Sequence, residues 1–224
     1  MTFSIVARCA ATGAFGVAVA SSSPAVAARC AYARNGVGAV ASQNVTDPTL
    51  GPRGLDLMAL GASAEQAIAA IRDSTDHLDY RQVLAVDRHG GSAIHSGAKA
   101  LGIWSAARDE NVACGGNLLA DPGVPSAMVQ EFLASDGHLG DRLIATMRAG
   151  LKTGGEAGPI HSAGLKLVDT VSWPVADLRV DWTEDCPIEG LASLWDRYKP
   201  QMDAYVTRAL HPAGAPSYGV PGDL

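Results

Sequence analysis

The feature that most constrains this chain is a strand-like run that begins at its second residue. Met1 is followed by Thr2, and residues 3–8 continue directly as an apolar segment. A glycine-containing turn at residues 12–14 separates this run from a second one at residues 15–21. Short apolar runs bounded by glycine and serine are typical of buried strands. We therefore expect an N-terminal hairpin, which would hold in place a chain end that is otherwise loose.

Thr2 is the candidate nucleophile. We expect Met1 to be trimmed because threonine is small, and we expect no leader or arm before it. Thr2 would then carry a free α-amine and a hydroxyl on adjacent carbons. An α-amine has a reference pKa of about 7.7–8.0, so it can act as a base near neutral pH. A hydroxyl activated by the N-terminal amine can attack a carbonyl carbon. An ordinary edge hairpin would start with the same residues.

An acyl-transfer site also needs hydrogen-bond donors for the developing oxyanion. Asn117 is the first candidate, because the glycine pair before it lets the backbone approach a ligand closely. Alternatively, Asn117 holds a turn through side-chain to backbone hydrogen bonds. Further candidates for supporting the amine or binding substrate lie on the face of Thr2 or at strand ends, where each could also be an ordinary structural residue: Ser4, Ser21, Ser22, Gln43 and Asn44.

Several blocks in order along nearly the whole chain carry a family resemblance: residues 2–8, 16–21, 36–43, 51–55, 116–120, 162–163 and 178–181. With these blocks the chain resembles small bacterial proteins of the N-terminal-nucleophile (Ntn) hydrolase type, a family of unknown function. The resemblance implies an α/β (α+β) fold, a four-layer αββα sandwich with two stacked sheets between helical layers. It also implies amide hydrolysis by the N-terminal residue, and it marks His95 and His161 as candidate substrate contacts because matching blocks adjoin them.

The chain departs from the family pattern in two places. After Gly154 and Gly155 the resemblance predicts an acidic residue and then an arginine-glycine pair, but here Glu156 is followed by Ala157-Gly158. His161 stands where glutamine is common, and the turn at residues 21–24 is less bulky and less apolar. These differences bear on substrate preference and leave the expected fold unchanged.

Composition is consistent with one soluble domain over residues 1–224, with a loose tail from about residue 211. Hydrophobic residues make up 47% of the chain, yet no uncharged run approaches the roughly 20 residues that span a bilayer. The net charge of −6 gives no basic footprint for nucleic acid. We therefore expect no membrane or nucleic-acid partner, a small-molecule amide as substrate, and a homodimer or higher homo-oligomer.

The cysteines are widely separated and lack the spacing of zinc ligands: Cys9, Cys30, Cys114 and Cys186. We expect them to be reduced thiols in a cytoplasmic protein. No signal peptide and no phosphate-binding or dinucleotide-binding glycine motif is evident. The sequence thus predicts no metal and no cofactor.

Beyond the hairpin, patterning predicts further strands at residues 37–42, 82–87, 93–95, 111–114 and 165–168. Helices are expected at residues 55–60, after a capping box at Ser63 and Gln66, at residues 125–135 and 139–152, and at residues 188–210 with a break at Pro200. The functional hypothesis is an N-terminal-threonine hydrolase of an amide or cyclic amide bond in a small molecule. The alternatives are a non-catalytic small-molecule binding protein that keeps the same fold, and a structural subunit whose N-terminus merely packs.

Overall fold

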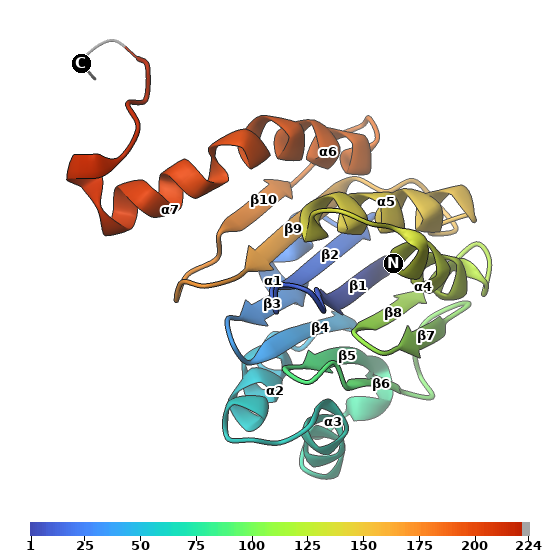
Figure 1. The fold of residues 1–224 in the computed structure, drawn as a ribbon. Coiled ribbons are helices and arrows are strands. Elements are labelled where there is room, and N and C mark those ends of the chain that lie inside the picture. The colour runs from blue at the N-terminus through green and yellow to red at the C-terminus, as the bar shows by residue number, and fades with distance from the viewer. Residues whose placement is uncertain (221–224) are drawn as a thin grey trace.

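The N-terminal hairpin forms the middle of a six-stranded antiparallel sheet (Figure 1). In this computed structural model, which describes residues 1–220, β1 (Thr2–Arg8) pairs with β2 (Phe15–Ser21) on one side and β8 (Val112–Asn117) on the other. Three further strands complete the sheet: β9 (Ser162–Val168), β10 (Ala176–Val180) and β7 (Ser105–Asp109). The predicted hairpin is confirmed, and strand pairing holds the chain start on both sides.

Both faces of β1 are buried, so the strand reads as a nearly continuous apolar run. Phe3, Ile5 and Ala7 pack in the core beneath the helices, whereas Val6 packs in the core between the two sheets. Because successive side chains alternate across a strand, Thr2 and Ser4 share the face of Val6. Thr2 therefore faces the second sheet.

The second sheet has four antiparallel strands: β3 (Ala31–Arg34), β4 (Gly38–Asn44), β5 (Arg81–Asp87) and β6 (Ser92–Ser96). Its inner face presents Ala39, Ala41 and Leu84 to Val17 and Val19 of the first sheet. These mostly small side chains let the two sheets stack closely, at the spacing of packed sheets.

Helices cover the outer face of each sheet. α2 (Leu50–Ala59) and α3 (Ala64–Asp73) pack on the four-stranded sheet, and α4 (Val124–Ala134), α5 (Leu139–Lys152) and α6 (Pro187–Tyr198) pack on the six-stranded sheet (Figure 1). The layers run helix, sheet, sheet, helix. The predicted αββα sandwich is confirmed.

Local signals placed several helix ends correctly. The predicted capping box forms at the start of α3, where the Ser63 hydroxyl accepts from Gln66 N and the Gln66 side chain accepts from Ser63 N. The predicted break at Pro200 is a 3₁₀ turn over Lys199–Gln201 that separates α6 from α7 (Met202–Leu210). The remaining short segments are α1 (Ala27–Cys30) and 3₁₀ turns at Leu78–Tyr80 and Pro212–Gly214.

The helix predicted at residues 55–60 begins earlier, at Leu50. Pro52 is tolerated in the first turn, where a missing N–H leaves no intrahelical bond unmade. Gly51 is required by packing, because a Cβ there would lie 2.0 Å from Cδ2 of the Tyr32 ring. Gly51 and Pro52 therefore belong to the first turn of the helix.

The expected loose tail is partly ordered. The Arg208 guanidinium donates to the carbonyls of Pro216 and Ser217 and lies 3.7 Å from the Tyr218 ring centroid. These contacts tie residues 216–218 to α7, which projects from the body in Figure 1. The rest of the predicted tail, residues 221–224, lies outside the described residues.

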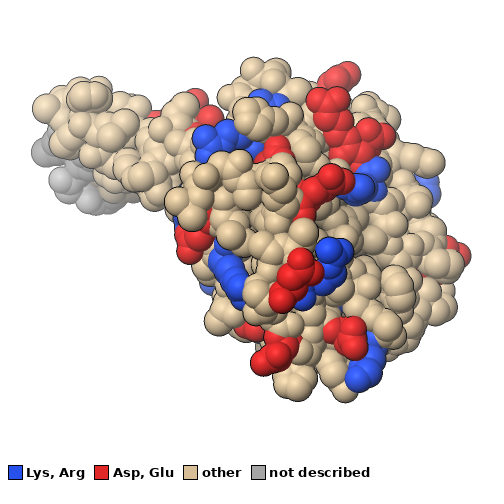
Figure 2. Space-filling model, turned by 90° about the horizontal axis from the view of Figure 1, so that it is seen from below, with Lys and Arg blue, Asp and Glu red and all other residues tan. Residues whose placement is uncertain are grey.

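Charged side chains are interspersed on the face seen in Figure 2, where acidic and basic groups alternate without a broad area of one sign. No helix within residues 1–220 combines the length and the apolar character that crossing a membrane requires.

Candidate functional site

A row of polar side chains crosses four strands at one end of the six-stranded sheet. Thr2 pairs with Asn117 of β8, and Ser21 of β2 pairs with Ser162 of β9. Because Phe3 pairs with Ala20 in an antiparallel register, Thr2 lies opposite Ser21. Directly opposed residues of antiparallel strands project to the same face, so all four side chains point between the sheets. Each is at most 5% exposed.

The Thr2 hydroxyl lies against Ser21 and the Met1 carbonyl. Thr2 Oγ1 is 3.4 Å from Ser21 Oγ, and both hydroxyls donate to the Met1 carbonyl oxygen. Ser21 Oγ also accepts from Ser23 N at 3.1 Å and lies 2.8 Å from Ser23 Oγ. The nucleophile candidate thus stands in a buried group of hydroxyls fixed by the neighbouring turn.

Asn117 is fully buried beside Thr2, and neither its Nδ2 nor its Oδ1 has a hydrogen-bond partner among residues 1–220. The turn-holding alternative requires a bond from this amide to the backbone, and the described part of the chain contains none. A buried polar group without a partner costs about 1–3 kcal/mol. Leu118, directly after it, has a positive φ of 52°, a strained conformation for leucine. The local fold therefore holds a costly amide next to the Thr2 hydroxyl.

Glu156 is a functional candidate that the sequence interpretation did not include. It bridges to Leu119, two residues after Asn117, and is 5% exposed. Its two carboxylate oxygens accept from Ser22 N at 3.1 and 3.2 Å. Burial raises the pKa of Glu156 to about 7, while the N-terminal amine, the bonds from Ser22 and His161 act in the opposite direction. The acidic residue after two glycines was the available signal, but the pattern gave it no role.

Ser4 and Gln43 belong to a hydrogen-bonded chain that links the two sheets. Ser4 Oγ donates to Gln43 Oε1 at 2.5 Å, and Gln43 Nε2 donates to Gln82 Oε1 at 2.7 Å. Gln82 Nε2 then donates to Ser96 Oγ at 3.0 Å and to the Ser105 carbonyl at 3.2 Å. Both atoms of the Gln43 amide are already paired, so this series of hydrogen bonds supports the structure around Thr2. Gln82 and Ser96 were not predicted from the sequence.

His161 lies beside this cluster. Its backbone N–H donates to the Ser21 carbonyl at 2.8 Å, and its ring stacks on Trp182 with centroids 4.3 Å apart. Nδ1 donates to the Thr183 carbonyl at 2.8 Å, so the ring orientation is fixed. Together with its influence on the pKa of Glu156, this places the imidazole within electrostatic reach of the site.

Two predicted contacts lie elsewhere. His95 pairs with Val83, which belongs to the core under α2 and α3, and its Nε2 bonds to the Leu78 carbonyl. The proposed contact of His95 with a substrate at Thr2 is therefore corrected, since the side chain lies on the opposite face of the four-stranded sheet. The Asn44 amide is engaged by the backbone, since it donates to the Tyr80 carbonyl and accepts from Leu101 N.

Comparison with known proteins places the chain in a family. Residues 2–191 match the profile of a family of unknown function, DUF1028. The chain belongs to this family. A crystal structure of the same family, protein SPO2555 from Silicibacter pomeroyi, is 30% identical, with a TM-score of 0.81 over 88% of this chain and 85% of that one.

A second solved structure, Anbu (ancestral beta-subunit) from Yersinia bercovieri, is 13% identical with a TM-score of 0.40, over 91% of this chain and 97% of that one. This likeness is too distant to support an argument. No curated protein matches the chain.

The arrangement suits carbonyl chemistry by side chains and an amine. No three His, Cys, Asp or Glu side chains within residues 1–220 are grouped so that they could hold a metal ion. The site brings together a hydroxyl (Thr2), a buried amide (Asn117), a buried carboxyl group (Glu156) and the start of the chain.

Proposed function

We propose that this protein is an N-terminal-threonine hydrolase that cleaves the carbon-nitrogen bond of a small amide or cyclic amide. Removal of Met1 would free the Thr2 α-amine and take away the carbonyl that now accepts from Thr2 and Ser21. The observation that carries the proposal is the buried Asn117 amide directly opposite Thr2, which has no hydrogen-bond partner in the described part of the chain. An unsatisfied buried amide calls for an explanation, and a catalytic role is one that fits its place beside Thr2.

The proposed reaction has two acyl-transfer steps. Thr2 Oγ attacks the amide carbon, and the Thr2 α-amine accepts the hydroxyl proton and passes it to the leaving nitrogen. Asn117 Nδ2, together with a backbone N–H, donates to the oxyanion. Water then attacks the resulting ester, the amine again moves the proton, and the carboxylic acid and free Thr2 hydroxyl are released.

In this scheme Glu156 positions the amine. Its carboxyl group is close enough to the chain start for the N-terminal amine to lower the pKa of Glu156. A carboxylate beside the protonated amine attracts it and so holds it in place. Ser21 and Ser22 hold the surrounding turn. The Ser21 hydroxyl contacts the Thr2 hydroxyl, and the Ser22 N–H donates to the Glu156 carboxylate. His161 would lie at the edge of the site where the substrate binds.

The first test is substitution at Thr2. Thr2→Ala should abolish turnover of a panel of small amides and lactams without changing the circular dichroism spectrum. Thr2→Ser should keep part of the activity, because it restores a hydroxyl. The control is Thr170→Ala, at an exposed threonine after β9, which should match the unmodified protein. If Thr2→Ala hydrolyses an accepted amide at the normal rate, the proposal fails.

The alternatives without catalysis apply if Met1 is retained. The Thr2 nitrogen would then be part of a peptide bond and could not accept a proton, and the Met1 carbonyl would stay against both hydroxyls. The same site would then bind a small molecule without cleaving it, or the chain end would only pack.

We further propose that the enzyme is cytoplasmic and forms homo-oligomers. Its four cysteines, all free in the structure, are compatible with a reducing compartment.

A further inference from the structure

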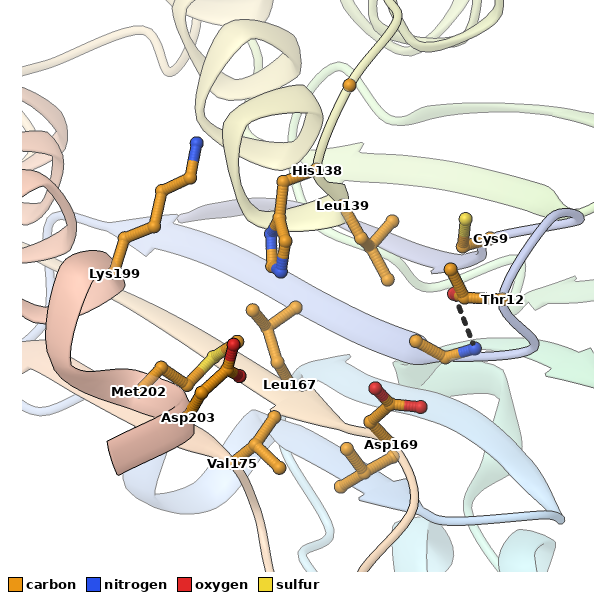
Figure 3. Close-up of a pocket in the computed structure, with 13 residues that line it drawn as sticks. Cys9, Thr12, His138, Leu139, Leu167, Asp169, Val175, Lys199, Met202 and Asp203 are labelled. Atoms are coloured by element: carbon orange, nitrogen blue, oxygen red, sulfur yellow. Dashed lines mark hydrogen bonds between the residues drawn. The ribbon is translucent and has the colours of Figure 1, made fainter. Parts of the chain in front are cut away.

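A cavity of about 320 Å³ opens at the end of the six-stranded sheet opposite Thr2 (Figure 3). It lies beyond the end of β1, at Cys9, and beside the end of β9, at Leu167. Thr2 is at the other end of β1, and a seven-residue strand spans about 20 Å. The cavity is therefore separate from the site proposed for hydrolysis. Its volume falls at the lower end of small-molecule sites, which are about 300–1,000 Å³.

The floor of the cavity is apolar. Leu139, Leu167 and Val175 line it from α5, β9 and the segment before β10, and Met202 closes it from α7. Lys199, Met202 and Asp203 lie beyond the residues matched by the family, which end at 191. One wall is thus contributed by the part of this chain outside the family match.

The rim of the cavity carries two carboxylates. Neither Asp169 nor Asp203 has a side-chain hydrogen bond or ion pair within the described residues, and Figure 3 shows them with Leu167 and Val175 between them. Lys199, the cation of the rim, is engaged by Asp141, with Nζ 2.5 Å from Oδ2. The uncompensated charge at the opening is therefore negative.

His138 supplies a neutral donor on the wall. Its Nδ1 accepts from Gly140 N at 3.0 Å, which requires the tautomer with the proton on Nε2. Burial lowers the pKa of His138, so the ring is uncharged at neutral pH and does not offset the two carboxylates. Figure 3 shows the ring extending into the cavity above Leu167.

We propose that this cavity binds a small organic cation, a primary ammonium group on an apolar or aromatic body. The body would fill the floor over Leu167 and Val175, and the ammonium group would lie between the carboxylates of Asp169 and Asp203. The same two carboxylates would repel an anion of the same shape.

The test compares two probes of similar shape, 2-phenylethylamine and 3-phenylpropanoate, by saturation-transfer NMR and titration on the full chain at neutral pH. The amine should bind with a Kd on the order of millimolar, about tenfold or more tighter than the carboxylate. Asp169→Asn and Asp203→Asn should each weaken amine binding by about two- to fivefold, as expected for partly exposed ion pairs. Asp196→Asn, an exposed α6 residue outside the cavity, should leave the affinity unchanged.

Variants that fill the cavity with a larger side chain test directly whether the amine binds there. Ala14→Phe, on the half-buried wall, should remove amine binding, and Thr12→Trp at the exposed rim does the same if the first variant fails to fold. Thr2→Ala should bind the amine normally, which separates this result from the fate of the proposed hydrolase. Equal binding of both probes, amine binding that survives the filled cavity, or no binding at the highest soluble amine concentration would overturn the proposal.

Discussion

Replacing Asn117 with leucine separates a functional role from a structural one by the sign of a stability change. The Asn117 amide is fully buried without a hydrogen-bond partner among residues 1–220. An unpaired buried polar group costs about 1–3 kcal/mol, and an apolar side chain of similar size removes that cost. We expect Asn117→Leu to raise the free energy of unfolding by about 1–3 kcal/mol. For a chain of this length each kcal/mol raises Tm by about 2–4 °C.

Gln43→Leu is the matched control, because it removes another fully buried amide from the same region. Both atoms of the Gln43 amide are paired, and its loss would strand the Ser4 hydroxyl and Gln82 Oε1. We expect destabilisation by about 1–3 kcal/mol from these orphaned groups. Two similar substitutions should thus move stability in opposite directions.

The assay is urea unfolding of both variants, followed by fluorescence and circular dichroism, with the midpoint and slope fitted together. Asn117→Leu should also reduce kcat more than it raises KM, because an oxyanion donor acts mainly in the transition state. Destabilisation of Asn117→Leu by 1 kcal/mol or more, as for Gln43→Leu, would show that the amide is needed for the fold and refute the reasoning.

Three further predictions concern pH and packing. Burial raises the pKa of Glu156 from 4.5 to about 7, so between these pH values the folded protein holds a proton that the unfolded chain releases. The free energy of unfolding should therefore fall as pH rises from about 4.5 to 7. Glu156→Gln should remove this slope in pH-dependent urea titrations. The kcat/KM should rise with pH through one ionisation, because only the neutral Thr2 amine accepts a proton, and a flat profile would exclude that base. Gly140→Ala should destabilise the fold by about 1–3 kcal/mol in thermal unfolding, since its Cβ would lie 2.3 Å from the Trp195 ring. Gly214→Ala should have no such effect because, apart from its neighbours in the chain, no atom of residues 1–220 would lie within 4 Å of its Cβ.

The N-terminal hairpin and the layer order could be predicted because their signals are local. Residues 3–8 and 15–21 are apolar runs with a glycine turn between them, and both strands are buried on two faces. The start of α3 was given by Ser63 and Gln66, whose capping bonds depend on only a few neighbouring residues. β3, β7 and β10 were missed because they are edge strands that are short and partly exposed, so their apolar pattern is weak.

The candidate site was predictable only in part because it depends on strand register. Thr2, Ser21 and Asn117 come from the ends of three strands, and pairing brings them into one row. Glu156 lies in a loop that reaches the row through the bridge to Leu119, a contact that no local pattern encodes. His95 shows the same limit, since its strand was predicted but the face it occupies depends on how the strand pairs.

The most direct test of the central claim is the mass of the chain before and after reaction with a β-lactone, a strained ester that acylates activated hydroxyls. We expect an intact mass without Met1, and a single acyl adduct that peptide mapping locates on Thr2. Adduct formation should be absent in Thr2→Ala and normal in Thr170→Ala. A chain that retains Met1, or one without Met1 that acquires its adduct at another residue, would contradict the assignment of Thr2 as the nucleophile.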